Sequence, residues 1–80
     1  MATIRSEEEA AQHILEVMVN QFHTGPGQIL MFGSFLKPFN ANGWSSADFN
    51  AGLEYGIRRG WLELPLPAQV RLTEAGFAAA

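Results

Sequence analysis

The sequence has 80 residues and a formal net charge of −3, from 5 Lys and Arg against 8 Asp and Glu, which fits one small domain. The absence of cysteine excludes a disulfide framework, a thiolate metal site and a cysteine nucleophile. No apolar segment approaches the ~20 residues that span a bilayer, and the N-terminus lacks a signal-peptide pattern, so we expect a cytoplasmic protein.

The charge is unevenly distributed along the chain. Residues 1–24 carry one arginine against four glutamates, whereas residues 25–80 carry four cations against four carboxylates. This acidity weakens a nucleic-acid prediction without excluding it, because such binding depends on a local basic patch. We expect one domain over 1–80, with frayed ends at 1–5 and 78–80.

The first helix is predicted over residues 7–22. Ser6-Glu-Glu-Glu9 has the spacing of a capping box, in which Ser6 and Glu9 exchange hydrogen bonds at the helix start. Apolar residues then recur at three- and four-residue steps and form one stripe. Further apolar residues widen it, which suits either a small domain wrapping its longest helix, the favoured interpretation, or a dimer contact. The widening residues are Ala11, Leu15 and Val19.

A second helix is predicted from Gln28 to Leu36. The His23–Gly27 segment breaks the first helix, and within it Thr24 and Pro26 suit the start of the next one. Lys37-Pro38 predicts its end, since the residue before proline avoids helical angles.

A third helix is predicted after a turn at residues 40–43, with Phe39 tucked into the core. Ser45 or Ser46 is the expected N-cap, and the helix runs to about Arg59 before a glycine stop. Its mid-helix glycines predict close approach of a backbone or a bulky ring. The predicted buried face is Phe49, Leu53, Gly56 and Ile57, and the predicted outer face is Ala47, Ala51, Glu54, Tyr55 and Arg58.

Short strands at 61–64 and 69–72 are predicted to form a hairpin around a tip at 65–68. Glu63 and Arg71 lie on its outer face, where they can pair across the strands. The predicted inward set is Leu62, Leu64, Val70 and Leu72. After the hairpin, Thr73 is expected to cap a short final turn that docks Phe77.

Three helices followed by a two-stranded wing resemble a winged helix-turn-helix domain, an α+β fold. The resemblance rests on Leu53 through Gly60, on Trp61-Leu-Glu-Leu64, and on Leu72-Thr-Glu-Ala-Gly76. It singles out no particular regulator family. In such domains the third helix enters the major groove of DNA and the wing touches the backbone or the minor groove. By position, the resemblance implies groove contacts from Ser46, Ala47, Asn50, Ala51, Glu54 and Arg58, and wing contacts from residues 65–71.

Two features depart from a DNA-binding pattern. Asp48 and Glu54 lie on or beside the exposed face of the third helix, where they would repel phosphates. The wing tip, Pro-Leu-Pro-Ala, carries no cation. The leading prediction is a small DNA-binding, transcription-regulator-like domain on double-stranded DNA, with contacts from Lys37, Ser46, Asn50, Arg58, Arg59 and Arg71.

The alternative prediction is a protein-interaction module or homodimer that does not bind DNA. Its expected surface combines an exposed small-residue face with apolar groups, from Ala47, Ala51, Tyr55 and Leu66. A third possibility, an enzyme accessory subunit or a phage- or plasmid-type adaptor, is favoured by no residue. We expect no enzymatic activity, no cofactor and no metal, since His13 and His23 are ten residues apart and lack a metal-ligand spacing.

Overall fold

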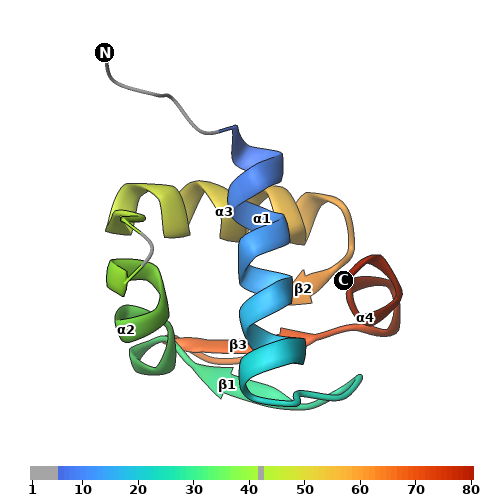
Figure 1. Cartoon of the computed structure of the whole chain (residues 1–80). Helices are drawn as coiled ribbons and strands as arrows, with labels where there is room; N and C mark the ends of the chain where they lie inside the picture. Colours follow the sequence, from blue (N-terminus) through green and yellow to red (C-terminus); the bar gives the residue numbers. More distant parts are fainter. Residues whose placement is uncertain (1–5, 42) are drawn as a thin grey trace.

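The computed structural model describes residues 6–41 and 43–80, which form a mixed α+β fold (Figure 1). Among these residues there are four α-helices and a three-stranded antiparallel sheet, one strand more than predicted. The elements in chain order are α1 (Glu7–Glu16), its π-helical continuation η1 (Val17–Gln21), β1 (Ile29–Met31), α2 (Gly33–Ala41), α3 (Ser46–Arg58), β2 (Leu62–Glu63), β3 (Gln69–Leu72) and α4 (Glu74–Ala79).

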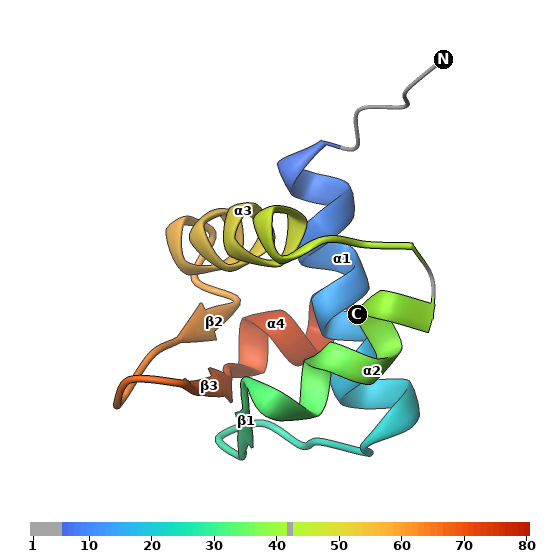
Figure 2. The same cartoon turned by 90° about the vertical axis from the view of Figure 1, so that its left-hand side faces the viewer.

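The sheet has the order β1-β3-β2, with β3 in the centre. β2 and β3 form the predicted hairpin, in which Leu62 faces Leu72 and Glu63 faces Arg71. β1, from an earlier part of the chain, pairs with the free edge of β3. Figures 1 and 2 show α3 lying across the N-terminal half of α1, with α2 and the sheet toward its other end.

The first helix starts at the predicted capping box and extends to Gln21, close to the predicted end. The Ser6 hydroxyl accepts from the Glu9 amide (3.1 Å), and the Glu9 carboxylate accepts from the Ser6 amide (3.3 Å). Ala11 and Leu15, which widen the apolar stripe, are fully buried inside the domain. The widened stripe therefore serves the domain's own core, as the favoured interpretation held.

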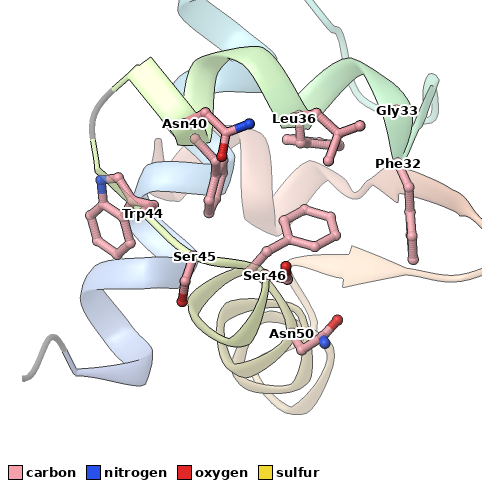
Figure 3. Close-up of a pocket in the computed structure, with 11 residues that line it drawn as sticks. Phe32, Gly33, Leu36, Asn40, Trp44, Ser45, Ser46 and Asn50 are labelled. Carbon is pink, nitrogen blue, oxygen red and sulfur yellow. The ribbon is translucent and has the colours of Figure 1, made fainter.

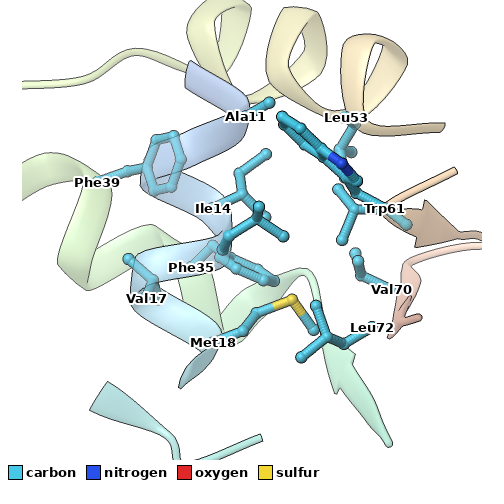
Figure 4. Packing of buried hydrophobic residues seen from close by; sticks show 12 residues of the cluster. Ala11, Ile14, Val17, Met18, Phe35, Phe39, Leu53, Trp61, Val70 and Leu72 are labelled. Atoms are coloured by element: carbon cyan, nitrogen blue, oxygen red, sulfur yellow. The ribbon is translucent and has the colours of Figure 1, made fainter. Parts of the chain in front are cut away.

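The core packs around α1 and η1 and receives buried side chains from α2, α3, β2, β3 and the segment before β2 (Figure 4). Its apolar members bury their surface against one another, which is the main favourable term in folding. The core residues are Ala11, Ile14, Leu15, Val17, Met18, Phe35, Phe39, Leu53, Trp61, Leu62, Val70 and Leu72.

The chain turns between η1 and β1, and no helix begins there. The predicted helix break is confirmed, but Thr24 and Pro26 do not start a new helix. The Thr24 amide donates to the Met18 carbonyl (2.7 Å), so Thr24 closes the end of η1. Gly27 adopts a φ of +83°, a left-handed angle that glycine takes without steric cost, and leads the chain into β1.

The predicted second helix over residues 28–36 is wrong. Ile29–Met31 is strand β1, and Phe32 adds a hydrogen bond to the turn of the β2–β3 hairpin, donating its amide hydrogen to the Ala68 carbonyl (2.8 Å). The run from Ile29 to Phe32 is continuously apolar, a pattern that periodicity alone cannot assign to helix or strand. Hydrogen bonding to β3 makes this segment a strand.

α2 begins at Gly33 and continues through Lys37-Pro38, where the sequence predicted a helix end. An interior proline removes a backbone hydrogen bond and costs about 3 kcal/mol. The helical path keeps Phe35 and Phe39 four residues apart on one face, where they are 1% and 4% exposed. Burial of two aromatic side chains, at roughly 1.5–3 kcal/mol each, offsets the cost of the proline. The predicted core position of Phe39 is confirmed.

The turn between α2 and α3 is displaced from its predicted position. Asn40 and Ala41 belong to α2, Asn42 lies outside the described residues, and Gly43 adopts a φ of +74°. α3 then begins after Ser45 and ends at Arg58, and Gly60 adopts a φ of +76°. The predicted glycine stop is therefore confirmed.

Ser45, rather than Ser46, is the N-cap of α3. Its hydroxyl accepts from the Asp48 amide (3.2 Å), and the Asp48 carboxylate accepts from the Ser45 amide (2.9 Å). We expect Ser45→Ala to lower the free energy of unfolding by about 1 kcal/mol, because the cap is lost. Ser46→Ala is the matched control and should change it by less than about 0.5 kcal/mol. Urea unfolding of both variants measures the difference, and equal effects would contradict this assignment.

α3 packs through glycines, as predicted, although its buried face is rotated. Gly52 lies against the backbone of Ala10 in α1, and Gly56 lies against the Leu62 side chain. Leu53 is buried as predicted, whereas Ile57 is 40% exposed and its predicted burial is wrong. α3 therefore contacts α1 through the side of the helix on which Gly52 lies.

Two apolar residues near the hairpin differ from their predicted positions. Leu64, which follows the last residue of β2, is 45% exposed, and Phe77 is 44% exposed on α4. Gly76 takes the buried position instead, against the carbonyl of Trp61. Thr73 caps α4 as predicted, accepting from the Gly76 amide (3.0 Å). α4 extends to Ala79, within the segment expected to fray.

Candidate functional site: a groove between α2 and α3

An apolar groove opens between α2 and α3, with a volume of about 260 Å³ (Figure 3). We call it the α2–α3 groove. Phe32 precedes α2 at one end, and Trp44 precedes the α3 cap at the other. The lining residues are Phe32, Gly33, Phe35, Leu36, Phe39, Asn40, Trp44, Ser45, Ser46, Phe49 and Asn50.

Packed aromatic rings form the walls of the groove. Phe49 of α3 is at the centre, with its ring centroid 5.2 Å from Phe32, 5.0 Å from Phe35 and 5.3 Å from Phe39. Phe39 in turn lies 5.8 Å from Trp44. Edge-to-face and tilted pairs at these distances are favourable beyond the area they bury. The groove is therefore held by side chains anchored in the core.

The rim of the groove combines one exposed leucine with small polar groups. Leu36 is 64% exposed, the largest exposure among the large apolar side chains of the described residues. Asn40 on α2 and Ser46 and Asn50 on α3 are exposed as well. An apolar floor with a few polar groups at the edge is the usual composition of a binding site.

Trp44 links the groove to an acidic surface on α1. The Trp44 ring stacks on His13 of α1, with centroids 4.7 Å apart and planes 7° from parallel. On its α1 side Trp44 borders a shallow depression lined by Glu8, Glu9, Gln12, His13 and Glu16, which we call the α1 acidic face. No lysine or arginine of the described residues lines this depression.

Most of the predicted DNA-contacting cations are engaged with other side chains of the domain. Arg58 pairs with Glu7 at the start of α1 (2.5 Å), and Arg71 makes the predicted cross-strand pair with Glu63 (3.3 Å). The Arg59 guanidinium lies 5.3 Å from the Trp61 ring centroid, a cation–π distance. Lys37 lies on α2, where it lines a second shallow depression beside Phe22.

The two polar DNA candidates, Ser46 and Asn50, line the α2–α3 groove. The residues of the alternative prediction do not line it. Ala47 is exposed and Ala51 is half-buried on another side of α3, while Tyr55 is half-buried with its ring 5.7 Å from Trp61. Leu66 is 59% exposed in the turn of the β2–β3 hairpin. The groove thus contains Ser46 and Asn50 of the predicted DNA set and no residue of the alternative set.

Within residues 6–41 and 43–80, no three His, Asp or Glu side chains come together in a way that could hold a metal ion. Over the same residues, no helix is both long enough and apolar enough to cross a membrane. Comparison with protein-family models matched no family, and neither the curated proteins nor the solved structures gave a significant match.

The predicted second helix did not indicate the groove because it ended at Leu36, whereas α2 runs to Ala41. Phe32, Phe35 and Phe39 follow one another at three- and four-residue spacing, which places them on one helical face. This pattern crosses Pro38, a residue type that usually ends or kinks a helix. The same spacing, read through Pro38, would have predicted an aromatic face on α2.

Proposed function

We propose that this chain is a winged-helix protein-interaction module whose α2–α3 groove receives an apolar side chain of a partner protein. Three features support the winged-helix part. α2 and α3 are separated by residues 42–45, a length typical of a helix-turn-helix, and this turn contains Gly43. The β2–β3 hairpin follows α3 directly, in the position of a wing. β1 widens the wing sheet on its other side.

The single observation that carries the interaction proposal is the groove itself. An apolar cavity of about 150 Å³ accommodates a benzene molecule, so a volume near 260 Å³ suits one large apolar side chain. Pockets for complete small-molecule ligands usually begin near 300 Å³. An apolar anchor residue in a pocket, surrounded by a polar rim, is the common arrangement of a protein-interaction hot spot. Leu36, exposed at the rim, supplies further apolar contact.

DNA binding is the second candidate, favoured by the exposed Ser46 and Asn50 on the N-terminal half of α3. Its weakness is electrostatic. Affinity for a duplex comes largely from neutralised phosphates, and Arg58 and Arg71 already pair with carboxylates. The interaction proposal keeps the prediction of a domain without enzymatic activity, cofactor or metal.

The experiment is a titration of the ¹⁵N-labelled protein with a helical peptide built from leucine and glutamine. We expect amide signals of Gly33, Asn40, Ser46 and Asn50 to shift on binding, while Ala68 at the wing turn remains unchanged. Leu36→Asp should weaken binding about tenfold or more, because the contact would bury a carboxylate against apolar surface.

Leu66→Asp is the matched control, because Leu66 is 59% exposed and Leu36 is 64% exposed. This variant should bind the peptide like the parent chain. A parallel titration with duplex DNA at low and at physiological salt separates the two candidate functions. Salt-sensitive duplex binding that Arg58→Ala with Arg59→Ala abolishes, together with no peptide binding, would replace the interaction proposal with the DNA one.

A further inference from the structure

We infer that the partner segment is cationic as well as apolar: it places its anchor residue in the α2–α3 groove and its lysines or arginines over the α1 acidic face. This inference rests on the proposed function of the groove and specifies the partner's chemistry. The two surfaces are adjacent because Trp44 lines both of them. A segment that is anchored in the groove and leaves it past Trp44 therefore lies over the carboxylates of α1.

Two carboxylates of the α1 acidic face, those of Glu8 and Glu16, are available to a partner. Within the described residues, Glu8 and Glu16 form no ion pair, whereas Glu7 is occupied by Arg58 and Glu9 closes the capping box at Ser6. Both are exposed. They are separated by eight residues of helix, which corresponds to about 12 Å along the axis. Cations two helical turns apart on a partner helix match this spacing.

Charge complementarity also argues against the other occupants. A second copy of this chain carries a net charge of −3, so its approach to the α1 acidic face would be opposed by like-charge repulsion. A nucleic-acid backbone or an anionic membrane surface would be repelled in the same way. A basic amphipathic segment of another protein is attracted by both parts of the surface.

The test compares three helical peptides with identical leucine positions, in which the polar positions are lysine, glutamine or glutamate. We expect the affinity to fall in that order. Glu8→Gln with Glu16→Gln should weaken the leucine–lysine peptide about three- to tenfold and leave the leucine–glutamine peptide unchanged. In the parent chain, added salt should lower the affinity of the leucine–lysine peptide and leave that of the leucine–glutamine peptide unchanged. This result does not depend on any variant.

Glu54→Gln with Glu74→Gln is the matched control, since it also removes two exposed carboxylates, and neither lines the groove or the α1 acidic face. It should change the affinity less than twofold. Equal affinities for the lysine and glutamine peptides would overturn the inference while leaving the groove proposal intact. No binding of the glutamine peptide would remove the groove proposal itself. Self-association through the groove, detected by sedimentation and abolished by Leu36→Asp, would overturn the inference by making a second copy the occupant.

Discussion

Phe35→Ala is expected to lower the free energy of unfolding by about 3–5 kcal/mol, the usual cost of truncating a buried phenylalanine. Phe35 is 1% exposed, and its ring packs against Phe49 (5.0 Å) and Phe39 (6.2 Å). The deletion removes apolar contact and leaves a cavity that its ring neighbours fill only in part. For a domain of this size the loss is a large share of the total stability. Urea or thermal unfolding measures it.

Leu36→Ala is the matched control, one residue along the same helix. Leu36 is 64% exposed, so its truncation should change the free energy of unfolding by less than about 0.5 kcal/mol. It should still weaken the peptide contact at the groove. Equal losses of stability at positions 35 and 36 would contradict the orientation of α2 and, with it, the groove.

Gly52→Ala is expected to lower the free energy of unfolding by about 1–2 kcal/mol, although alanine is the better helix former by about 1 kcal/mol. A Cβ atom at Gly52 would lie 2.7 Å from the carbonyl carbon of Ala10 and 2.9 Å from its oxygen. Ordinary contacts lie near 3.5–4.0 Å. These neighbours are backbone atoms of α1, so the two helices would have to separate.

Gly33→Ala is the control for the glycine substitution. Nothing lies within 4 Å of a Cβ atom at Gly33, which is the first residue of α2. The change should be neutral or stabilise the fold by about 0.5 kcal/mol, because alanine lowers the conformational entropy of the unfolded chain. Thermal unfolding of the two variants compares them directly. A stabilising Gly52→Ala would show that α1 and α3 do not approach this closely.

Local signals in the sequence correctly predicted two helix caps, one helix end and one cross-strand ion pair. The capping box at Ser6, the cap at Thr73, the glycine stop at Gly60 and the Glu63–Arg71 cross-strand pair are all confirmed. Each depends on residues close together in sequence or on a hairpin register. These features could therefore be predicted without knowledge of contacts between distant parts of the chain.

The middle of the chain depended on tertiary contacts that a single sequence does not display. The segment from Ile29 to Met31 becomes a strand because β3 is beside it, and β3 follows some forty residues later. The helix continues through Pro38 because Phe35 and Phe39 must both reach the core. The α2–α3 groove lies in this region, so the error in the second helix concealed the candidate site.

The most direct test of the interaction proposal is the structure of the complex with the leucine–lysine peptide, determined by intermolecular nuclear Overhauser effects. We expect contacts from a peptide leucine methyl to the rings of Phe32 and Phe49 and to the Leu36 side chain. Contacts confined to Leu66 in the β2–β3 turn, to Tyr55, or to no fixed position would contradict the assignment of the α2–α3 groove as the binding site.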